Sequence, residues 1–268
     1  MRTAGLVLCA AFTLVPVPAL AQSTVQQLPA GTSAQVAVPA NSIAAAVASA
    51  SRTADNVELD ESRKPAEVLE FFGLKPGMHV LDLFGGNRYW AEIMAPVVGP
   101  SGSVVVWQPA QFMGDKTSSA FKAFTAHQPN AILISSPFEQ PTLGQNRYDL
   151  AMFNLNYHDT YWQNPERKIP RMDPDEWLKA LYAAMKPGGI VGVIDHVASP
   201  NDDTRATVEK YHRIDPAVVK ADFERAGFVL DGTSDMLRNP ADDHSLKVFD
   251  PAIRGKTDRF VFRFRKPA

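Results

Sequence analysis

Cysteine is almost absent from the sequence, since Cys9 is the only one among 268 residues. It lies within a short apolar stretch near the N-terminus that we expect to be removed from the mature protein. The mature chain is therefore predicted to have no disulfide, no zinc–thiolate site and no thiol nucleophile. Its stability must come from its core, and roughly 200 folded residues can bury enough apolar surface for that.

A charge excess and a long apolar run are also missing. The chain has 27 basic and 29 acidic residues, for a formal net charge of −2, which does not suit a nucleic-acid surface. The apolar run at residues 6–15 is too short, and followed too soon by proline, for a membrane span. With Arg2 before it and the A-x-A pattern of residues 19–21 after it, the run predicts a signal peptide over residues 1–21. We therefore expect a periplasmic or secreted protein, with no integral membrane span in the mature chain.

Several widespread catalytic motifs do not occur. The sequence contains no H-E-x-x-H, no G-x-S-x-G, no Walker loop and no zinc-binding spacing. A hydrolase or a kinase therefore has no support from motifs.

The composition divides the remaining chain into two parts. Residues 22–54 are rich in alanine, serine and glutamine, which predicts a flexible leader, and a single domain is expected over residues 55–268. Within the domain, short apolar runs alternate with helical periodicity, which predicts an α/β fold with a doubly wound, mostly parallel sheet. Strands are expected near residues 80–84, 103–108, 131–135, 150–153, 190–195, 228–230 and 259–265. Phenylalanine alternates with other residues in the last run, as in an edge strand with one wet face.

The stretch MHVLDLFGGNRYW at residues 78–90 combines a buried strand, a glycine turn and the start of a helix. This arrangement brings backbone N–H groups and a helix N-terminus close to a ligand. Ligands of such sheets bind beyond the carboxyl ends of the strands, so polar residues at those ends are expected to converge on one cleft.

Two later segments, YDLAMFNLNYHD and MKPGGIVGVIDH, resemble the late half of class I S-adenosylmethionine (SAM) methyltransferases. More narrowly, residues 60–267 resemble a group of exported predicted methyltransferases of bacteria, through NYHD, HRIDP and a long C-terminal segment beginning LRNPADDH. The resemblance implies a Rossmann-like fold with an antiparallel C-terminal edge strand. It also implies SAM as the cofactor, held by Asp82, Gly85, Gly86, Asn87, Tyr89, Gln108 and Asn154.

Three positions depart from the family pattern. Phe84 and Arg88 replace the first and third glycines of the loop, and Gln108 stands where an acidic residue usually binds the ribose. Arg88 either pairs with Glu92, four residues further along the helix, or points into the cleft and repels the sulfonium of SAM. We therefore expect SAM binding to be weak or to have been lost.

Tyr157, His158 and Asp159 follow the fourth predicted strand and are the candidate catalytic residues. His158 is expected to act as a general base held by Asp159 or another acid. The alternative is a polar loop in which the histidine bonds to the backbone. Tyr157 is a second candidate for removing a proton.

Other histidine and aspartate groups have simpler interpretations. Asp195 and His196 are interpreted as a structural pair at a strand end, and the resemblance alone places His212 near the cleft. Adjacent ligands in one loop rarely face one ion, so no metal site is predicted at the Asp-Asp-His run of residues 242–244. A salt-bridge cluster with Arg238, Arg254 or Lys256 is expected there instead.

Two functions from different classes fit these observations. The first is SAM-dependent methyl transfer to an unknown, small acceptor. The second is a catalytically inactive, methyltransferase-like protein that binds a ligand or a partner in the periplasm. No nucleic-acid partner is expected for either.

Overall fold

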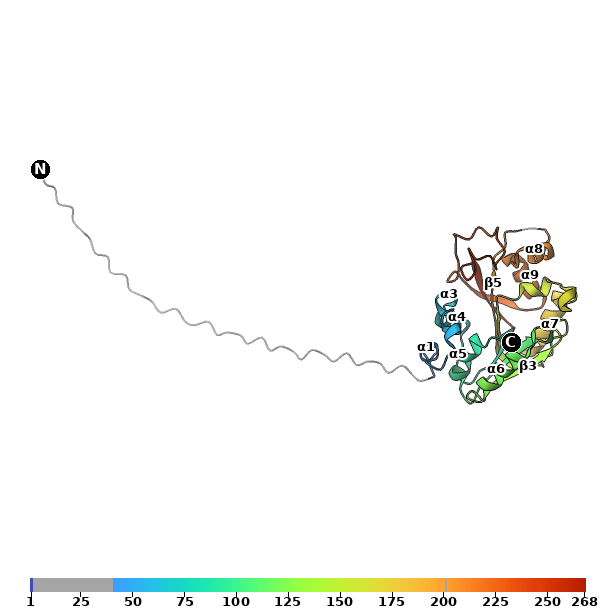
Figure 1. Cartoon of the computed structure of the whole chain (residues 1–268), viewed down its shortest axis with the longest axis horizontal. Coiled ribbons are helices and arrows are strands. Elements are labelled where there is room, and N and C mark those ends of the chain that lie inside the picture. The colour runs from blue at the N-terminus through green and yellow to red at the C-terminus, as the bar shows by residue number, and fades with distance from the viewer. Residues whose placement is uncertain (2–40, 201) are drawn as a thin grey trace. The chain divides into compact units, whose positions relative to one another are not determined.

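The computed structural model describes Met1, residues 41–200 and residues 202–268, so the predicted signal peptide and most of the predicted leader lie outside the described residues (Figure 1). The described strands form a seven-stranded sheet in the order β3-β2-β1-β4-β5-β7-β6. Their bounds are β1 (His79–Leu83), β2 (Ser103–Pro109), β3 (Ala131–Ser136), β4 (Tyr148–Asn154), β5 (Met185–His196), β6 (Val229–Ser234) and β7 (Arg259–Arg265).

Nine α-helices and three 3-10 turns connect these strands in the described part. The helices are α1 (Ile43–Val47), α2 (Ala54–Val57), α3 (Asp60–Arg63), α4 (Pro65–Phe72), α5 (Tyr89–Val98), α6 (Asp115–Thr125), α7 (Pro174–Ala184), α8 (Thr204–Tyr211) and α9 (Pro216–Arg225). The 3-10 turns are η1 (Ala110–Phe112), η2 (His158–Tyr161) and η3 (Pro165–Arg167). Residues 41–200 and 202–268 contain no helix that is both long enough and apolar enough to cross a membrane.

The predicted α/β class and the mostly parallel sheet are confirmed. β1 to β5 pair in parallel, and β7 runs antiparallel to both β5 and β6. The C-terminal strand is thus antiparallel, as expected, but β6 and not β7 lies at the edge. The reason is burial on both faces of β7: its phenylalanines are buried, and the Arg263 guanidinium lies over the Phe71 ring.

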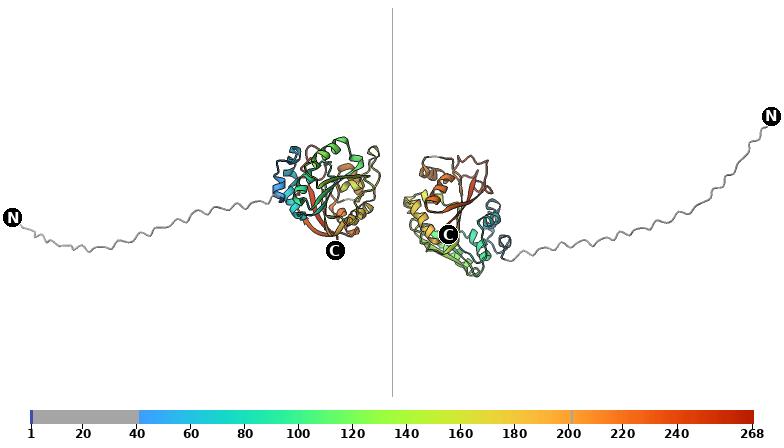
Figure 2. Two further views of the ribbon diagram at one scale, coloured as in Figure 1. Left: turned by 90° about the horizontal axis from the view of Figure 1, so that it is seen from below. Right: turned by 180° about the vertical axis from the view of Figure 1, so that it is seen from behind.

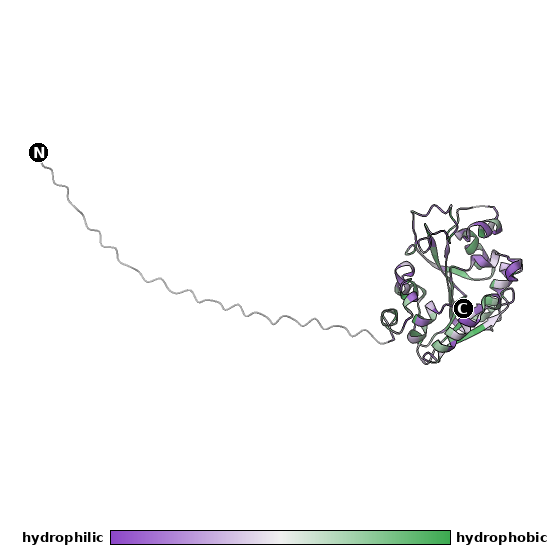
Figure 3. Cartoon of the chain, in the orientation of Figure 1, coloured by the Kyte–Doolittle hydropathy of each residue, from purple (hydrophilic) through white to green (hydrophobic). Residues whose placement is uncertain are grey.

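The two faces of the sheet bury two separate hydrophobic clusters. Leu81 and Leu83 of β1 face the cluster under α7 and α9, whereas Val80 faces the cluster under α4 and α5. Helices α1 to α5 and helices α7 to α9 accordingly lie on opposite sides of the strands (Figures 1 and 2). Hydrophobic residues colour the central strands green, while the surrounding helices carry much of the polar purple (Figure 3). Alternation along the strands thus directs Asp82 to the α4 and α5 side.

The folded part begins before the predicted boundary at residue 55. The Ser42 side chain caps α1, and Ala46 is buried in the cluster under α4 and α5. Arg52 then makes a bidentate ion pair with Asp60, at 2.6 and 2.8 Å. Alanine side chains are small and let α1 approach α5 closely. Flexible segments are also rich in alanine, so composition alone does not distinguish this packed helix from a flexible leader.

Candidate functional site

Asp82 is the buried, next-to-last residue of β1, and its Oδ2 atom has no hydrogen-bond partner among the described residues. Burial raises the pKa of this carboxyl to about 7, and the positive charge of Arg63 opposes the rise. A buried carboxylate oxygen without a partner is costly, and such groups concentrate at functional sites. Asp82 thus has an unused acceptor where the resemblance places the cofactor.

The glycine loop lies against Asp82 on one side and Gln108 on the other. A side chain at Gly85 would collide with the Asp82 carboxylate, and one at Gly86 would come within 2.6 Å of Gln108 Oε1. The Gly86 N–H donates to that same Gln108 oxygen at 3.0 Å. Two of the predicted cofactor residues, Gly86 and Gln108, therefore contact each other directly.

The two residues that replace glycines keep a left-handed backbone, with φ of 61° at Phe84 and 66° at Arg88. The Phe84 ring packs edge-on against Trp107 and Phe138, at centroid distances of 5.2 and 5.0 Å. It thereby fills the α7-side core. Both positions thus have a left-handed backbone, which glycine adopts freely and which costs strain for residues with a side chain.

Arg88 takes the first of its two predicted positions. Its guanidinium lies 3.6 Å from Glu92 and 3.3 Å from the Thr53 hydroxyl. The Arg88 guanidinium is therefore held by Glu92 and by Thr53 of the N-terminal segment. It does not point into the cleft, where it would repel the sulfonium of SAM.

Tyr89 does not contribute to the ligand side of the loop as predicted. Its hydroxyl donates to Asp60 at 2.7 Å, and the Arg63 guanidinium lies over its ring. Asn87 is exposed and its side chain accepts the Tyr89 N–H, while Asn154 is half-buried at the end of β4. Tyr89 is fully buried because it joins α5 to the helices at the start of the domain.

Tyr157 is also placed differently from its predicted catalytic role. It is fully buried, its ring packs on Phe153 and Phe223, and its hydroxyl donates to Asp222 at 2.7 Å. Burial and the negative charge of Asp222 raise the pKa of this phenol well above its ordinary value. Tyr157 is a core residue that anchors α9, because the turn after β4 directs its ring inward.

His158, in contrast, has an organised environment. Its Nδ1 atom lies 2.8 Å from Asp195 Oδ1, and its backbone N–H donates to the other oxygen of the same carboxylate. Burial lowers the pKa of His158, but Asp195 and Asp159 outweigh it and raise the pKa to about 9. Asp195, interpreted from the sequence as structural, is thus the residue that orients His158.

His158, Asp159 and His212 meet at one wall of a cavity of about 370 Å³. His158 Nε2 lies 3.5 Å from Asp159 Oδ1, and His212 Nδ1 lies 3.8 Å from the same oxygen. Burial raises the pKa of Asp159 to about 6 and lowers that of His212 to about 4, the latter with help from the His158 charge. The remaining lining residues are Phe112, Leu155, Trp162, Asn164, Arg167, His196, Lys247, Val248 and Phe249.

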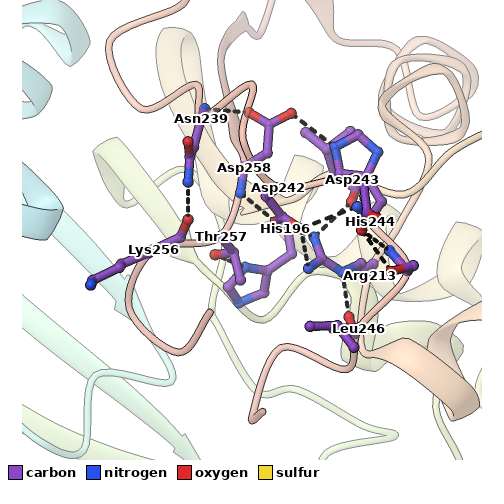
Figure 4. A network of polar contacts seen from close by, with 12 residues as sticks. His196, Arg213, Asn239, Asp242, Asp243, His244, Leu246, Lys256, Thr257 and Asp258 are labelled. Carbon is purple, nitrogen blue, oxygen red and sulfur yellow. Dashed lines mark hydrogen bonds and ion pairs between the residues drawn. The ribbon is translucent and has the colours of Figure 1, made fainter. Parts of the chain in front are cut away.

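A charged network holds the connection between β6 and β7 beside this cavity (Figure 4). Arg213 makes a bidentate ion pair with Asp242, at 2.9 and 3.0 Å, and Asp242 also accepts the Asp258 N–H. Asp258 in turn binds Arg238 and His244. Asp242 and His244 therefore belong to a salt-bridge cluster, but their direct partners are Arg213 and Asp258, and of the expected partners only Arg238 joins the cluster, through Asp258.

Sequence reasoning missed several cavity residues, namely Phe112, Trp162, Lys247 and Phe249. They come from loops and turns, and their positions depend on packing that no periodicity describes. The NYHD segment was a usable signal for Trp162, which follows it closely, but Lys247 and Phe249 carried no signal of their own.

The strand order and the glycine loop after β1 identify the architecture. The fold is that of the class I methyltransferases. Solved structures with this fold include a SAM-dependent methyltransferase from Aquifex aeolicus, with a TM-score of 0.54 and 17% identity over 80% of this chain and 94% of that one. The 1,6-didemethyltoxoflavin-N1-methyltransferase of Burkholderia thailandensis, solved with 1,6-didemethyltoxoflavin and S-adenosylhomocysteine, has a TM-score of 0.50 and 14% identity over 80% of each chain. The [4+2]-cyclase SpnF has a TM-score of 0.56 and 15% identity over 77% of this chain and 81% of that one.

A family model also matches part of the methyltransferase fold in this chain. The model for protein-L-isoaspartate(D-aspartate) O-methyltransferase matches residues 37–133, which include β1, the glycine loop and β2. The chain has no match among curated proteins. The structural likenesses lie at low identity and show the fold alone, whereas the family-model match supports the predicted enzyme class and its cofactor.

The residues at the loop fit SAM. Asp82 offers a buried carboxylate oxygen that has no partner among the described residues. Gly85 and Gly86 have no side chains, so the loop backbone can come close to a ligand. Gln108 presents an amide on the side of the loop away from Asp82. Asp82 would hold the cofactor through an accepted hydrogen bond, and Gln108 would bind ribose hydroxyls. When bound, SAM supplies an electrophilic methyl group.

Proposed function

We propose that the chain is a SAM-dependent methyltransferase that acts on a small acceptor bound in the cavity at His158. The observation that carries the proposal is the unpartnered Asp82 oxygen beside the Gly85–Gly86 turn, in a fold that hosts SAM enzymes. The family-model match over the same part of the chain supports it.

The cavity lining indicates the chemistry of the acceptor. Arg167 and Lys247 bring positive charge to it, and Trp162 and Phe249 bring flat apolar surface. A volume of about 370 Å³ suits a small molecule. We therefore infer an acceptor with an aromatic or other flat body and an anionic group.

Proton removal from such an acceptor falls to Asp159 more readily than to His158. With a pKa of about 9, His158 already carries a proton at pH 7, whereas Asp159, with a pKa of about 6, is mostly ionised. Asp195 holds the imidazolium of His158 in place, and that charge keeps Asp159 ready to accept a proton. Orientation of the acceptor in the cavity supplies the remainder of the catalysis.

Calorimetric titration of the purified protein with SAM and with S-adenosylhomocysteine tests the proposal. We expect one site per chain, and we expect Asp82→Ala to weaken binding at least tenfold because it removes the acceptor. Glu61, which is exposed on α3, gives a matched control as Glu61→Ala. Binding that is absent, or that is insensitive to Asp82→Ala, would refute the cofactor assignment.

The Gln108–Gly86 hydrogen bond favours the alternative function, a non-catalytic binding protein. It occupies a loop N–H with the protein's own side chain, where a carboxylate would usually face the ribose. This alternative predicts that small anionic aromatic compounds bind at the His158 cavity, while neither SAM nor its demethylated product binds.

We also propose that the protein is exported after cleavage behind residue 21. The basic, apolar and A-x-A regions of the first 21 residues support this location. N-terminal sequencing of the protein from a cell-envelope fraction is expected to begin at Gln22. Retention of Met1 in a cytoplasmic fraction would contradict it.

A further inference from the structure

Three side chains in the cavity present metal-ligand atoms toward one another. His158 Nε2 lies 3.5 Å and His212 Nδ1 lies 3.8 Å from Asp159 Oδ1, and one ligand atom from each of the three residues lies within 4.8 Å of the others. A tetrahedral ion with ligands near 2.1 Å separates its ligand atoms by about 3.4 Å. Small side-chain movements would therefore bring the three atoms onto one ion.

The surroundings of His158 match those of metal-binding histidines. Its Nδ1 side is held by the buried Asp195 carboxylate at 2.8 Å, which leaves Nε2 directed at Asp159. A carboxylate behind a ligating histidine fixes the ring and increases its basicity toward the metal. Asp159 and Asp195 together also carry the two negative charges that balance a divalent cation.

The three donors leave at least one coordination position free. The same residues line the cavity, so a free position would face the space where a ligand binds. Two imidazole nitrogens and one carboxylate oxygen suit zinc, iron(II) or cobalt(II) rather than calcium or magnesium, which prefer all-oxygen sites.

We propose that His158, Asp159 and His212 form a binding site for a divalent transition metal, with an open position toward the cavity. The ion would bind an anionic or ionisable group of the acceptor there. Metal binding can be measured apart from SAM binding, since none of the three ligands belongs to the loop around Asp82, but it shares His158 and Asp159 with the acceptor cavity of the proposed function.

The test uses the purified protein after removal of metals with a chelator. Zinc is titrated by calorimetry, and cobalt(II) is followed by its visible absorption, which reports tetrahedral nitrogen and oxygen ligands. One equivalent of each is expected to bind. Asp159→Asn and His212→Asn are each expected to weaken zinc binding at least tenfold. Asparagine suits position 212 because His212 has a left-handed φ of 51°, which asparagine adopts readily.

His127→Gln is the matched control, since this histidine is exposed, follows α6 and does not line the cavity of the proposed ligands. Unaltered circular dichroism establishes that each variant is folded, and His212→Asn decides the matter if Asp159→Asn does not fold. Binding that is absent, or that only His127→Gln reduces, would overturn the metal site. SAM binding without metal binding would overturn this inference alone, and metal binding without SAM binding would refute the methyltransferase proposal alone.

Discussion

Gln108 presents an amide at a position where a carboxylate would bind the ribose hydroxyls of the cofactor more strongly. Gln108 Oε1 already accepts the Gly86 N–H, and glutamate can make the same contact with a charged oxygen. Hydrogen bonds to a charged acceptor contribute about 1.5–3 kcal/mol, against about 1 kcal/mol for neutral pairs.

We predict that Gln108→Glu strengthens SAM binding by about tenfold, because about 1.4 kcal/mol corresponds to a tenfold change. Titration calorimetry on the variant and the parent at equal ionic strength measures this. Gln108→Leu serves as the comparison and is expected to weaken binding, since it leaves the Gly86 N–H without its acceptor. Equal affinity in all three proteins would show that Gln108 does not face the ribose.

A second residue-scale prediction concerns the pH dependence of stability. The folded pKa of Asp82, about 7, lies above its ordinary value of 3.8. The stability that the protonated Asp82 carboxyl contributes to the folded state is therefore fully present below pH 3.8. It is lost as the pH rises through about 7, because the buried carboxyl must then ionise. We predict that Asp82→Asn is about 2–4 kcal/mol more stable than the parent at pH 8, and not at pH 4.

Urea unfolding of both proteins at the two pH values checks the difference. If the difference in unfolding free energy between the parent and Asp82→Asn were the same at pH 4 and at pH 8, the pKa of Asp82 would not be raised by burial.

Among the elements, the short helices α1 to α3 are the part that sequence patterns described least well. The starts of α7 and α9 carry clear local signals, since Asp173 and Asp215 cap them by accepting backbone N–H groups and a proline follows each cap. The short α1 has no comparable periodicity, since five residues are too few to display it. Its position depends on long-range contacts, notably Arg52 with Asp60 and Thr53 with Glu92.

We predict that Arg52→Ala destabilises the domain by about 3 kcal/mol, because it leaves a partly buried Asp60 without its bidentate partner. Lys179→Ala is the matched control, since Lys179 and Glu176 are an exposed pair and their loss costs about 0–1 kcal/mol. Thermal unfolding monitored by circular dichroism measures both. An Arg52→Ala protein that unfolds at the same temperature as Lys179→Ala would contradict a packed N-terminal segment.

Across the whole molecule, the sequence predicted how the strands are arranged, but it did not predict which residues would line the cavity together. Alternating apolar runs and glycine turns determine a doubly wound sheet, and the sheet brings strand ends such as Asp82 and Asn154 to one edge. His212, the left-handed residue at the end of α8, reaches His158 through that turn, and Tyr157 points into the core while its buried neighbour His158 lines the cavity. Side-chain direction in irregular segments depends on packing over the entire domain, which no local pattern encodes.

The position of β7 has a consequence for how the protein is synthesised. It is synthesised after the other six described strands, yet it lies between β5 and β6 and pairs with both. A nascent chain therefore cannot complete this sheet until β7 has been synthesised, and β6 has no neighbouring strand until then. A premature stop before Arg259 would release a product with two unpaired strand edges, a target for aggregation and for quality-control proteases.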